Sequence, residues 1–167
     1  DLRTVNEIFN RKDYDAREDL DVVVDLGANI GISALFFLTL NDHSRVYCYE
    51  PSPVNLPRLE ANLAAYSDRT VIDPRAVSET SGVFKFNAEP VGRYGGLLTE
   101  QYTEPVVNVI DVEVIDVNAA LESILAREPR INMLKVDTEG TEVPIVKAIR
   151  PDLLDRIDEI VLEATVP

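Results

Sequence analysis

The stretch "VVVDLGANIGISALFFL" (22–38) decides the fold, because it joins a strand pattern to a helix pattern through a very short turn. Its opening run of valines (22–24) is typical of a strand buried on both faces. The apolar run 32–40 suits a buried helix. Only "DLGANIG" (25–31) joins the two, and it holds an acid, two glycines and an asparagine. The spacing therefore predicts a strand, a sharp turn and the start of a helix.

Strand and helix patterns alternate along the whole chain. Further strand patterns lie at 46–50, 70–73, 132–137 and 159–164. Helix patterns lie at 31–40, 53–66, 118–127 and 141–149, and either Ser52 or Asn55 can cap the second of them. Strands that alternate with helices pair in parallel through right-handed crossovers. The sequence therefore predicts an α/β fold, a Rossmann-like, doubly wound, mostly parallel sheet with flanking helices.

The middle of the chain breaks this alternation. "GVFKFN" (82–87) and "VVNVIDVEVI" (106–115) alternate with period two, as half-exposed strands do. Between them lies a stretch without periodicity (88–105), which is typical of a functional or a disordered loop. Tyr94, among the glycines of "GRYGG", suits a lid or an acceptor contact, and an ordinary mobile surface loop fits equally well.

Length and composition indicate one domain. The chain has 167 residues, enough for one sizeable core, and we expect a polar lead-in (1–21) followed by a single domain (22–167). Because the chain opens on Asp1 and stops after an apolar run, we expect it to be a piece of a longer protein.

Charge and residue counts narrow the function classes. Thirty acids against 16 bases give a net charge of −14, which disfavours binding to nucleic acid. The longest uncharged apolar run (30–40) is too short to span a bilayer and has no secretory flank, so we expect a cytoplasmic domain without membrane contact. One cysteine excludes an internal disulfide, and one histidine argues against a His-rich zinc site.

The turn after the first strand is a candidate ligand site. In doubly wound sheets ligands bind beyond the carboxyl ends of the strands. Gly27 would let a ligand approach the backbone, Gly31 would let the helix begin close to the strand, and Asn29 tolerates a left-handed conformation. A purely structural tight turn remains the alternative.

Glu50 indicates what the turn binds. It ends the second strand pattern twenty-three residues after Gly27, the spacing at which an acid reaches a ribose. A dinucleotide fingerprint has a middle glycine, which is absent between Gly27 and Gly31. Asp25, directly before the turn, would repel a pyrophosphate and suit an ammonium group. These residues favour S-adenosylmethionine over NAD.

Four segments, in order, resemble motifs of FkbM-type methyltransferases over about residues 20–164: "VVVDLGANIG", "VYCYEPSPVNLPRLEANL", "RAVSETSG" and "MLKVDTEGTEVPIVKAI". Those enzymes are class I, S-adenosylmethionine-dependent and mostly methylate hydroxyl groups on sugars and natural products. Their folds normally continue into two further strands at an antiparallel edge, so the resemblance implies a domain truncated after the fifth main strand.

The resemblance also implies roles for individual residues. The turn residues Asp25, Gly27, Ala28, Asn29 and Gly31 would bind the cofactor, chiefly its methionine part, and Glu50 would bind its ribose. Pro51 would shape the next turn, Ala76 and Val77 would lie near the adenine, and Asp137 would face the sulfonium.

"LKVDTEGTE" (134–142) supplies the candidate catalytic acids. Asp137 or Glu139 would orient or deprotonate an acceptor hydroxyl, unless Asp137 only fixes the cofactor and Glu139 only caps the next helix. Glu142 is better explained as a helix cap. Lys135 lies on the same strand face as Asp137 and can pair with a carboxylate. Glu163 could join Asp137 in a metal site, but two acids at neighbouring strand ends are too little evidence to predict one.

The sequence thus predicts a methyltransferase that acts on an oxygen of a small-molecule acceptor and uses S-adenosylmethionine, and it indicates no metal-binding residues. A non-catalytic cofactor- or partner-binding module of a larger protein is the main alternative, and an NAD-dependent oxidoreductase is a weaker one. His43 is expected at the surface, away from the site, and Cys48 in the core.

Overall fold

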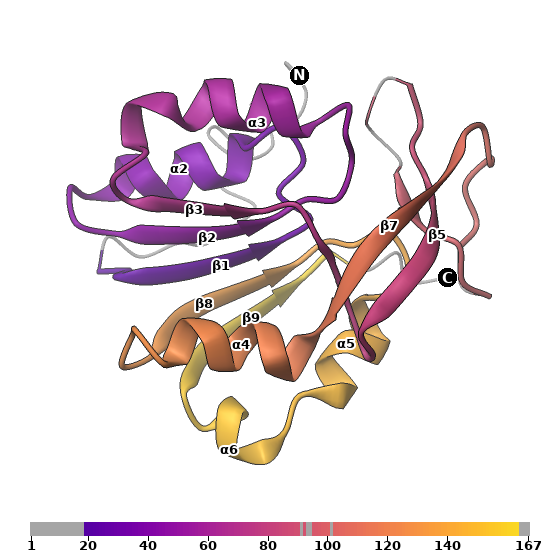
Figure 1. The fold of residues 1–167 in the computed structure, drawn as a ribbon. Helices are drawn as coiled ribbons and strands as arrows, with labels where there is room; N and C mark the ends of the chain where they lie inside the picture. Colours follow the sequence, from indigo (N-terminus) through magenta and orange to yellow (C-terminus); the bar gives the residue numbers. More distant parts are fainter. Residues whose placement is uncertain (1–18, 91, 93–94, 101, 164–167) are drawn as a thin grey trace.

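The main layer of the computed structural model, which describes residues 19–90, 92, 95–100 and 102–163, is a five-stranded parallel sheet (Figure 1). Its strands are β1 (Val22–Leu26), β2 (Arg45–Tyr49), β3 (Thr70–Asp73), β8 (Ile131–Val136) and β9 (Ile157–Leu162). Their order is β3-β2-β1-β8-β9, and every neighbouring pair is parallel. The ends of β1, β2 and β8 therefore meet at one edge.

Helices cover both faces of this sheet (Figure 1). One face carries α2 (Ile32–Leu40) and α3 (Leu56–Leu63), which the short 3₁₀ turn η2 (Ala64–Tyr66) continues. The other face carries α4 (Val117–Leu125), α5 (Glu142–Ala148) and α6 (Pro151–Leu154). The valines of β1 alternate between the two cores, Val23 on one side and Val22 and Val24 on the other. Burial on both faces explains the continuous apolar pattern of β1.

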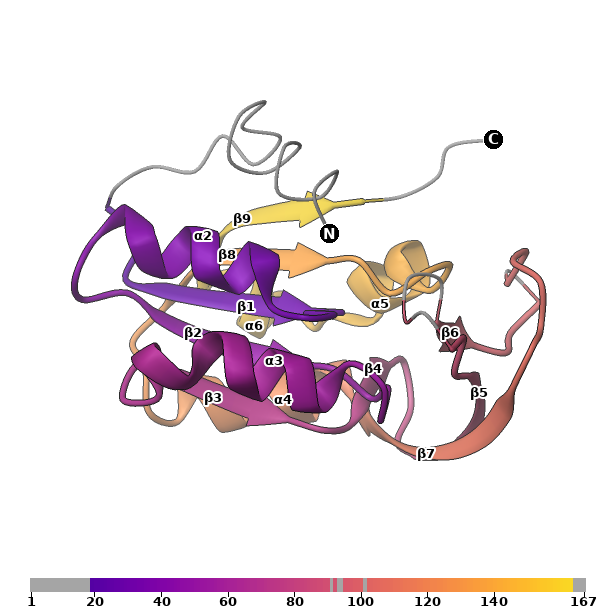
Figure 2. The ribbon, with the colours of Figure 1, turned by 90° about the horizontal axis from the view of Figure 1, so that it is seen from above.

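A second, four-stranded sheet lies beyond the carboxyl ends of the first (Figure 2). Its strands are β4 (Ala76–Ser78), β5 (Gly82–Asn87), β6 (Gly96–Leu97) and β7 (Val109–Asp116), in the order β4-β7-β5-β6. The β5–β7 pairing is antiparallel, and a small core of its own, which includes Phe86 and Leu97, lies on one face. This sheet closes the space into which the parallel strands point.

The predicted fold class is confirmed, with small shifts at element ends. β1, β3 and β5 have the predicted bounds, while β2, β8 and β9 begin and end one or two residues early. Helix α3 is shorter than predicted, and β4, β6 and α6 were not predicted. The polar lead-in, apart from residues 19–21, and Tyr94 fall outside the described residues.

Two residues lie where the sequence places them. His43 is exposed in the turn between α2 and β2, beside Asp21 and Asp42, on the edge opposite the strand carboxyl ends. The Cys48 side chain is fully buried in β2, and burial raises the pKa of its thiol well above the ordinary value. Neither residue takes part in the site.

Candidate functional site

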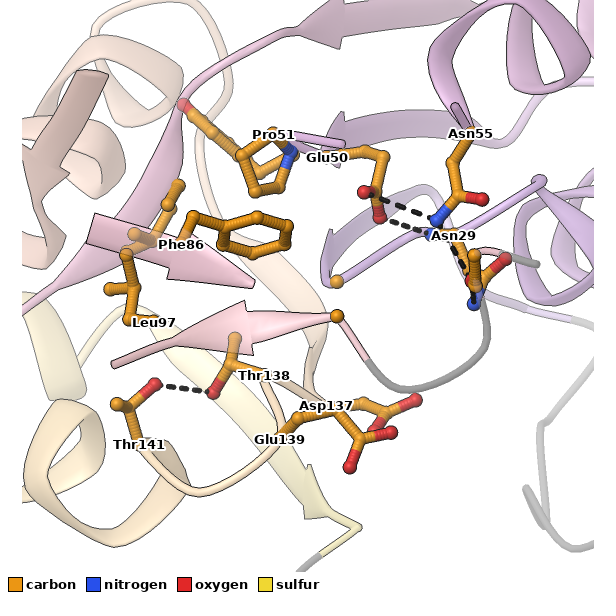
Figure 3. Close-up of a pocket in the computed structure, with 16 residues that line it drawn as sticks. Asn29, Glu50, Pro51, Asn55, Phe86, Leu97, Asp137, Thr138, Glu139 and Thr141 are labelled. Atoms are coloured by element: carbon orange, nitrogen blue, oxygen red, sulfur yellow. Dashed lines mark hydrogen bonds between the residues drawn. The ribbon is translucent and has the colours of Figure 1, made fainter. Parts of the chain in front are cut away.

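An open cavity of about 550 Å³ lies between the two sheets, at the carboxyl ends of β1, β2 and β8 (Figure 3). Gly27, Asn29, Glu50 and Asp137 line it from the parallel sheet, and the second sheet adds its own residues. The cavity is therefore where a doubly wound fold is expected to bind a ligand.

Gly27 is required by the neighbouring strand rather than by a ligand alone. Its φ is 83°, and a Cβ there would lie 1.8 Å from the carbonyl oxygen of Asp137. The turn is held further by the N–H groups of Gly27 and Ala28, which donate to the Tyr49 carbonyl oxygen. The predicted reason, ligand approach, is thus incomplete: the first requirement at Gly27 is close packing of β1 against β8.

Of the other turn residues, one lines the cavity and two pack within the fold. Asn29 adopts the predicted left-handed conformation, with φ 51°, and lines the cavity. Gly31 has a φ of 84°, and a Cβ there would lie 2.7 Å from Leu59 Cδ1, so a glycine also lets α2 pack closely against α3. Ala28 is buried in the core and is not among the cavity-lining residues.

Asp25 lies beneath the turn and not in the cavity, which corrects the expectation that it faces the ligand. Its side chain is fully buried, and it accepts hydrogen bonds from Ser33 Oγ (2.5 Å) and Lys135 Nζ (2.9 Å). Lys135 also donates to the Gly27 carbonyl oxygen and to Asp137 Oδ2, both at 3.3 Å. The predicted pairing of Lys135 with a carboxylate is therefore confirmed, and it ties the turn to β8.

Glu50 turns its carboxylate into the cavity although the residue is only 5% exposed (Figure 3). Oε2 accepts from the Asn29 N–H (2.8 Å), and Oε1 accepts from the Ser52 N–H (2.9 Å) and Asn55 Nδ2 (3.4 Å). Burial raises the pKa of this carboxyl, and the three hydrogen bonds oppose that effect. Among the described residues Oε2 has a single donor, so an acceptor position stays open for a ligand.

Apolar side chains form the walls beside Glu50. Pro51, Ala76 and Val77, all predicted from the sequence, line the cavity. Phe86 from β5 and Leu97 from β6 line it from the second sheet (Figure 3). Apolar walls next to a carboxylate suit a ligand with a flat apolar part and hydroxyl groups.

The acids after β8 form the other end of the cavity (Figure 3). Asp137 and Glu139 both line it, and Glu139 has a left-handed φ of 57°, a conformation that is uncommon outside glycine. Burial, and then the negative charges of Asp137 and its neighbours, raise the pKa of Glu139 to about 7. A carboxyl with such a pKa can exchange a proton near neutral pH.

Glu142 stabilises the loop that carries these acids. It begins α5, and its carboxylate accepts from the N–H groups of Thr138 and Gly140 at 2.9 Å each. Thr141 Oγ1 donates to Thr138 Oγ1 across the same loop (Figure 3). Glu142 lies in the first turn of α5, as predicted, but its carboxylate binds N–H groups of the loop before the helix, and it does not line the cavity.

A search against protein families matches the methyltransferase FkbM domain over residues 25–167. The chain belongs to the FkbM methyltransferase domain family. The similarity extends to curated proteins. The chain is 29% identical to the hexuronic acid methyltransferase AglP of Haloferax volcanii, over 98% of this chain and 63% of that protein. It is 27% identical to the 31-O-demethyl-FK506 methyltransferase FkbM of Streptomyces tacrolimicus, over 86% of this chain and 65% of that protein.

A solved structure supports the same fold. The FkbM methyltransferase of Methylobacillus flagellatus superposes with a TM-score of 0.55 at 20% identity, over 86% of this chain and 32% of that one. The present FkbM chain thus spans slightly less than two thirds of the length of the two curated relatives above.

The sequence analysis gave no site role to several residues that line the cavity. Asn55 was interpreted only as a helix cap, and Phe86 and Leu97 lie in segments predicted as a half-exposed strand and a loop. Thr138 and Thr141 were within a quoted motif but received no role. The sequence did hold signals for these residues. Asn55, Thr138 and Thr141 lie in segments that resemble the family. Phe86 and Leu97 lie on either side of the glycine-rich stretch "GRYGG".

The described part of the chain was searched for metal-binding clusters and for membrane-spanning helices. There, no group of three or more His, Cys, Asp or Glu side chains is arranged to hold a metal ion. Among the same residues, each helix is too short or too polar for a bilayer span.

Proposed function

We propose that this FkbM domain binds S-adenosylmethionine in the cavity and directs its methyl group to a hydroxyl oxygen of a sugar or natural product. The observation that carries the proposal is the buried Glu50 carboxylate, which keeps an open acceptor position towards the cavity, opposite the acids Asp137 and Glu139. A carboxylate that accepts from hydroxyl groups is the usual partner of a ribose at this point of the fold.

The cavity residues fit this cofactor. Phe86, Leu97 and Val77 offer apolar surface for a base beside Glu50. Asp137 and Glu139 would repel a pyrophosphate and attract a cationic group. S-adenosylmethionine carries an ammonium group and an activated methyl group on a sulfonium, and no phosphate. The chain itself then needs only to bind, orient and accept a proton.

We assign the proton acceptor to Glu139. Its raised pKa, about 7, would let it take the proton of an acceptor hydroxyl, and S-adenosylmethionine would supply the methyl group that replaces that proton. Asp137 is contacted by Lys135 Nζ at 3.3 Å, so its negative charge is compensated in part. We therefore assign Asp137 to orientation and charge stabilisation.

The acceptor is proposed as a small molecule with a free hydroxyl group. The names of two relatives give a hexuronic acid and 31-O-demethyl-FK506 as what those proteins methylate. The cytoplasmic location expected from the sequence belongs to the same proposal.

Ligand-dependent melting tests the cofactor. At about a hundred times its Kd, a ligand adds about 2.7 kcal/mol of stability, and in a domain of this size that corresponds to roughly 5–10 °C. We expect this shift with S-adenosylmethionine and with S-adenosylhomocysteine, and none with NAD. A shift with NAD alone would contradict the proposal and favour an oxidoreductase.

Transfer of a labelled methyl group tests the activity. The full-length protein is incubated with methyl-labelled S-adenosylmethionine and a panel of hydroxyl-bearing sugars and natural products. We expect label on at least one acceptor, and less of it in Glu139→Gln. Cofactor binding without transfer to any member of a broad panel would instead support a non-catalytic module.

A further inference from the structure

Asn55 occupies a helix cap but does not use its side chain as one. It is the N-cap residue of α3, a position at which asparagine usually accepts a hydrogen bond from the first helical turn. The structure has no such bond from its side chain. The side chain, only 3% exposed, points instead between Glu50 and Gly92 (Figure 3).

The orientation of the Asn55 amide is fixed by two acceptors. Nδ2 donates to Glu50 Oε1 (3.4 Å) and to the Gly92 carbonyl oxygen (3.1 Å). Flipping the amide would place Oδ1 against both of these oxygens, which is unfavourable. In the adopted orientation Oδ1 is buried and has no partner, alone among the buried side-chain nitrogen and oxygen atoms of the described residues. A buried oxygen without a hydrogen bond destabilises the fold.

Gly92 connects the same amide to the turn after β1. Its carbonyl oxygen accepts from Asn29 Nδ2 as well as from Asn55 Nδ2, both at 3.1 Å. A Cβ on Gly92 would lie 2.0 Å from Asn55 Oδ1, so the backbone passes directly over this amide. Asn55 thereby links α3, the Glu50 carboxylate and the segment between β5 and β6.

We propose that Asn55 is a positioning residue for nucleoside recognition: it holds Glu50 Oε1 so that Oε2 presents its open acceptor position to a ribose. This inference rests on the proposed function, since it concerns the same cavity. The forgone cap and the unpaired Oδ1 show that the side chain is not placed for stability. Stability sacrificed in this way is characteristic of functional sites.

The test measures binding of S-adenosylhomocysteine by calorimetry together with the melting temperature of each ligand-free variant. Asn55→Ala removes the donor to Glu50 and also the unpaired oxygen. We expect its affinity to fall about two- to tenfold, the range for an ordinary hydrogen bond, and its melting temperature to stay equal or rise.

Asn62→Ala is the matched control. Asn62 is an exposed asparagine of α3 that donates to the Ile30 carbonyl oxygen (2.7 Å) and does not line the cavity. We expect its affinity to equal that of the parent. Asn55→Asp keeps the shape but replaces the donor with a carboxyl beside Glu50. It should bind more weakly than Asn55→Ala at pH 8 and recover as the pH is lowered, because protonation removes the repulsion.

Each result decides between distinct conclusions. Parent-like affinity in Asn55→Ala, or a fall in its melting temperature that accounts for weaker binding, overturns the positioning role. So does an Asn55→Asp variant that binds better than Asn55→Ala at pH 8. If the parent itself binds no S-adenosylhomocysteine, the proposed function fails, and the inference fails with it.

Discussion

Glu50 combines burial with a dense set of donors. Two backbone N–H groups and one amide reach its carboxylate, which leaves a single oxygen position towards the cavity. Its arrangement therefore differs from that of Asp25, which two side chains bind deep in the core.

Substitution of Glu50 tests the ribose contact. We expect Glu50→Ala to weaken S-adenosylhomocysteine binding about ten- to a hundredfold, because hydrogen bonds to a charged group contribute about 1.5–3 kcal/mol. Glu50→Gln keeps the shape and should lie between that variant and the parent. Calorimetry measures both. Affinity equal to the parent in Glu50→Ala would show that the carboxylate does not contact the ligand.

The same substitution also carries a stability effect. Removal of the carboxylate leaves the N–H groups of Asn29 and Ser52 without their acceptor, at a cost of about 1–3 kcal/mol if no water replaces it. Chemical denaturation separates this loss from the loss of affinity. Val24→Ala is the control, because it removes core contacts of β1 at a residue that does not line the cavity and should lower stability only.

Glu139 should make the stability of the fold depend on pH. Its pKa is raised from an ordinary 4.5 to about 7, so between these values the folded state holds a proton that the unfolded state has released. Stability contributed by this proton is present below pH 4.5 and is lost as the pH rises to about 7. We expect denaturation midpoints of the parent to fall across that window relative to those of Glu139→Gln. Parallel profiles would contradict a raised pKa.

At the scale of elements, helices and strands with a regular sequence pattern were predictable, and very short ones were not. β1 and α2 each follow from a continuous apolar run, and β5 from strict alternation. β4 has 3 residues, β6 has 2 and α6 has 4, too few for a periodic signal, and pairing or packing with distant segments forms them. The direction of the Asp25 side chain was mispredicted for a related reason, since its partner Lys135 lies 110 positions away.

The buried ion pair between Asp25 of β1 and Lys135 of β8 can be tested directly. Lys135→Met leaves the Asp25 carboxylate buried without its cation, which typically costs about 3–5 kcal/mol. We expect Asp25→Asn combined with Lys135→Met to recover much of that loss, because no buried charge remains between the two strands. Urea denaturation measures both proteins. A double variant no more stable than Lys135→Met would mean that the loss is one of packing.

At the scale of the whole molecule, the cavity depends on two sheets whose relative placement no sequence pattern specified. The turn residues and Glu50 were predictable, because they follow strands of a familiar order. Phe86, Leu97 and Gly92 were not, because they reach the site only when the second sheet packs across the strand ends. The backbone of Glu139 lies close to this sheet, 3.1 Å from where a Cβ on Gly96 would be.

Hydrogen exchange can show whether a ligand contacts both sheets. We expect S-adenosylhomocysteine to slow amide exchange in the turn 27–31 and also in β5 and β6, since Phe86 and Leu97 line the same cavity. α6, which lines no part of the cavity, should exchange at an unchanged rate and serves as the internal control. Protection confined to the parallel sheet would place the ligand away from the second one.

The reactivity of the buried Cys48 thiol can report how often the fold opens around β2. As the only cysteine, it can react with an alkylating reagent only when β2 leaves the core. Where reclosing is faster than alkylation, the labelling rate follows the population of opened molecules, which a bound ligand lowers by the factor 1 + [L]/Kd. Ligand affinity at the carboxyl end of that strand can therefore be read from a mass spectrum, before any acceptor is known.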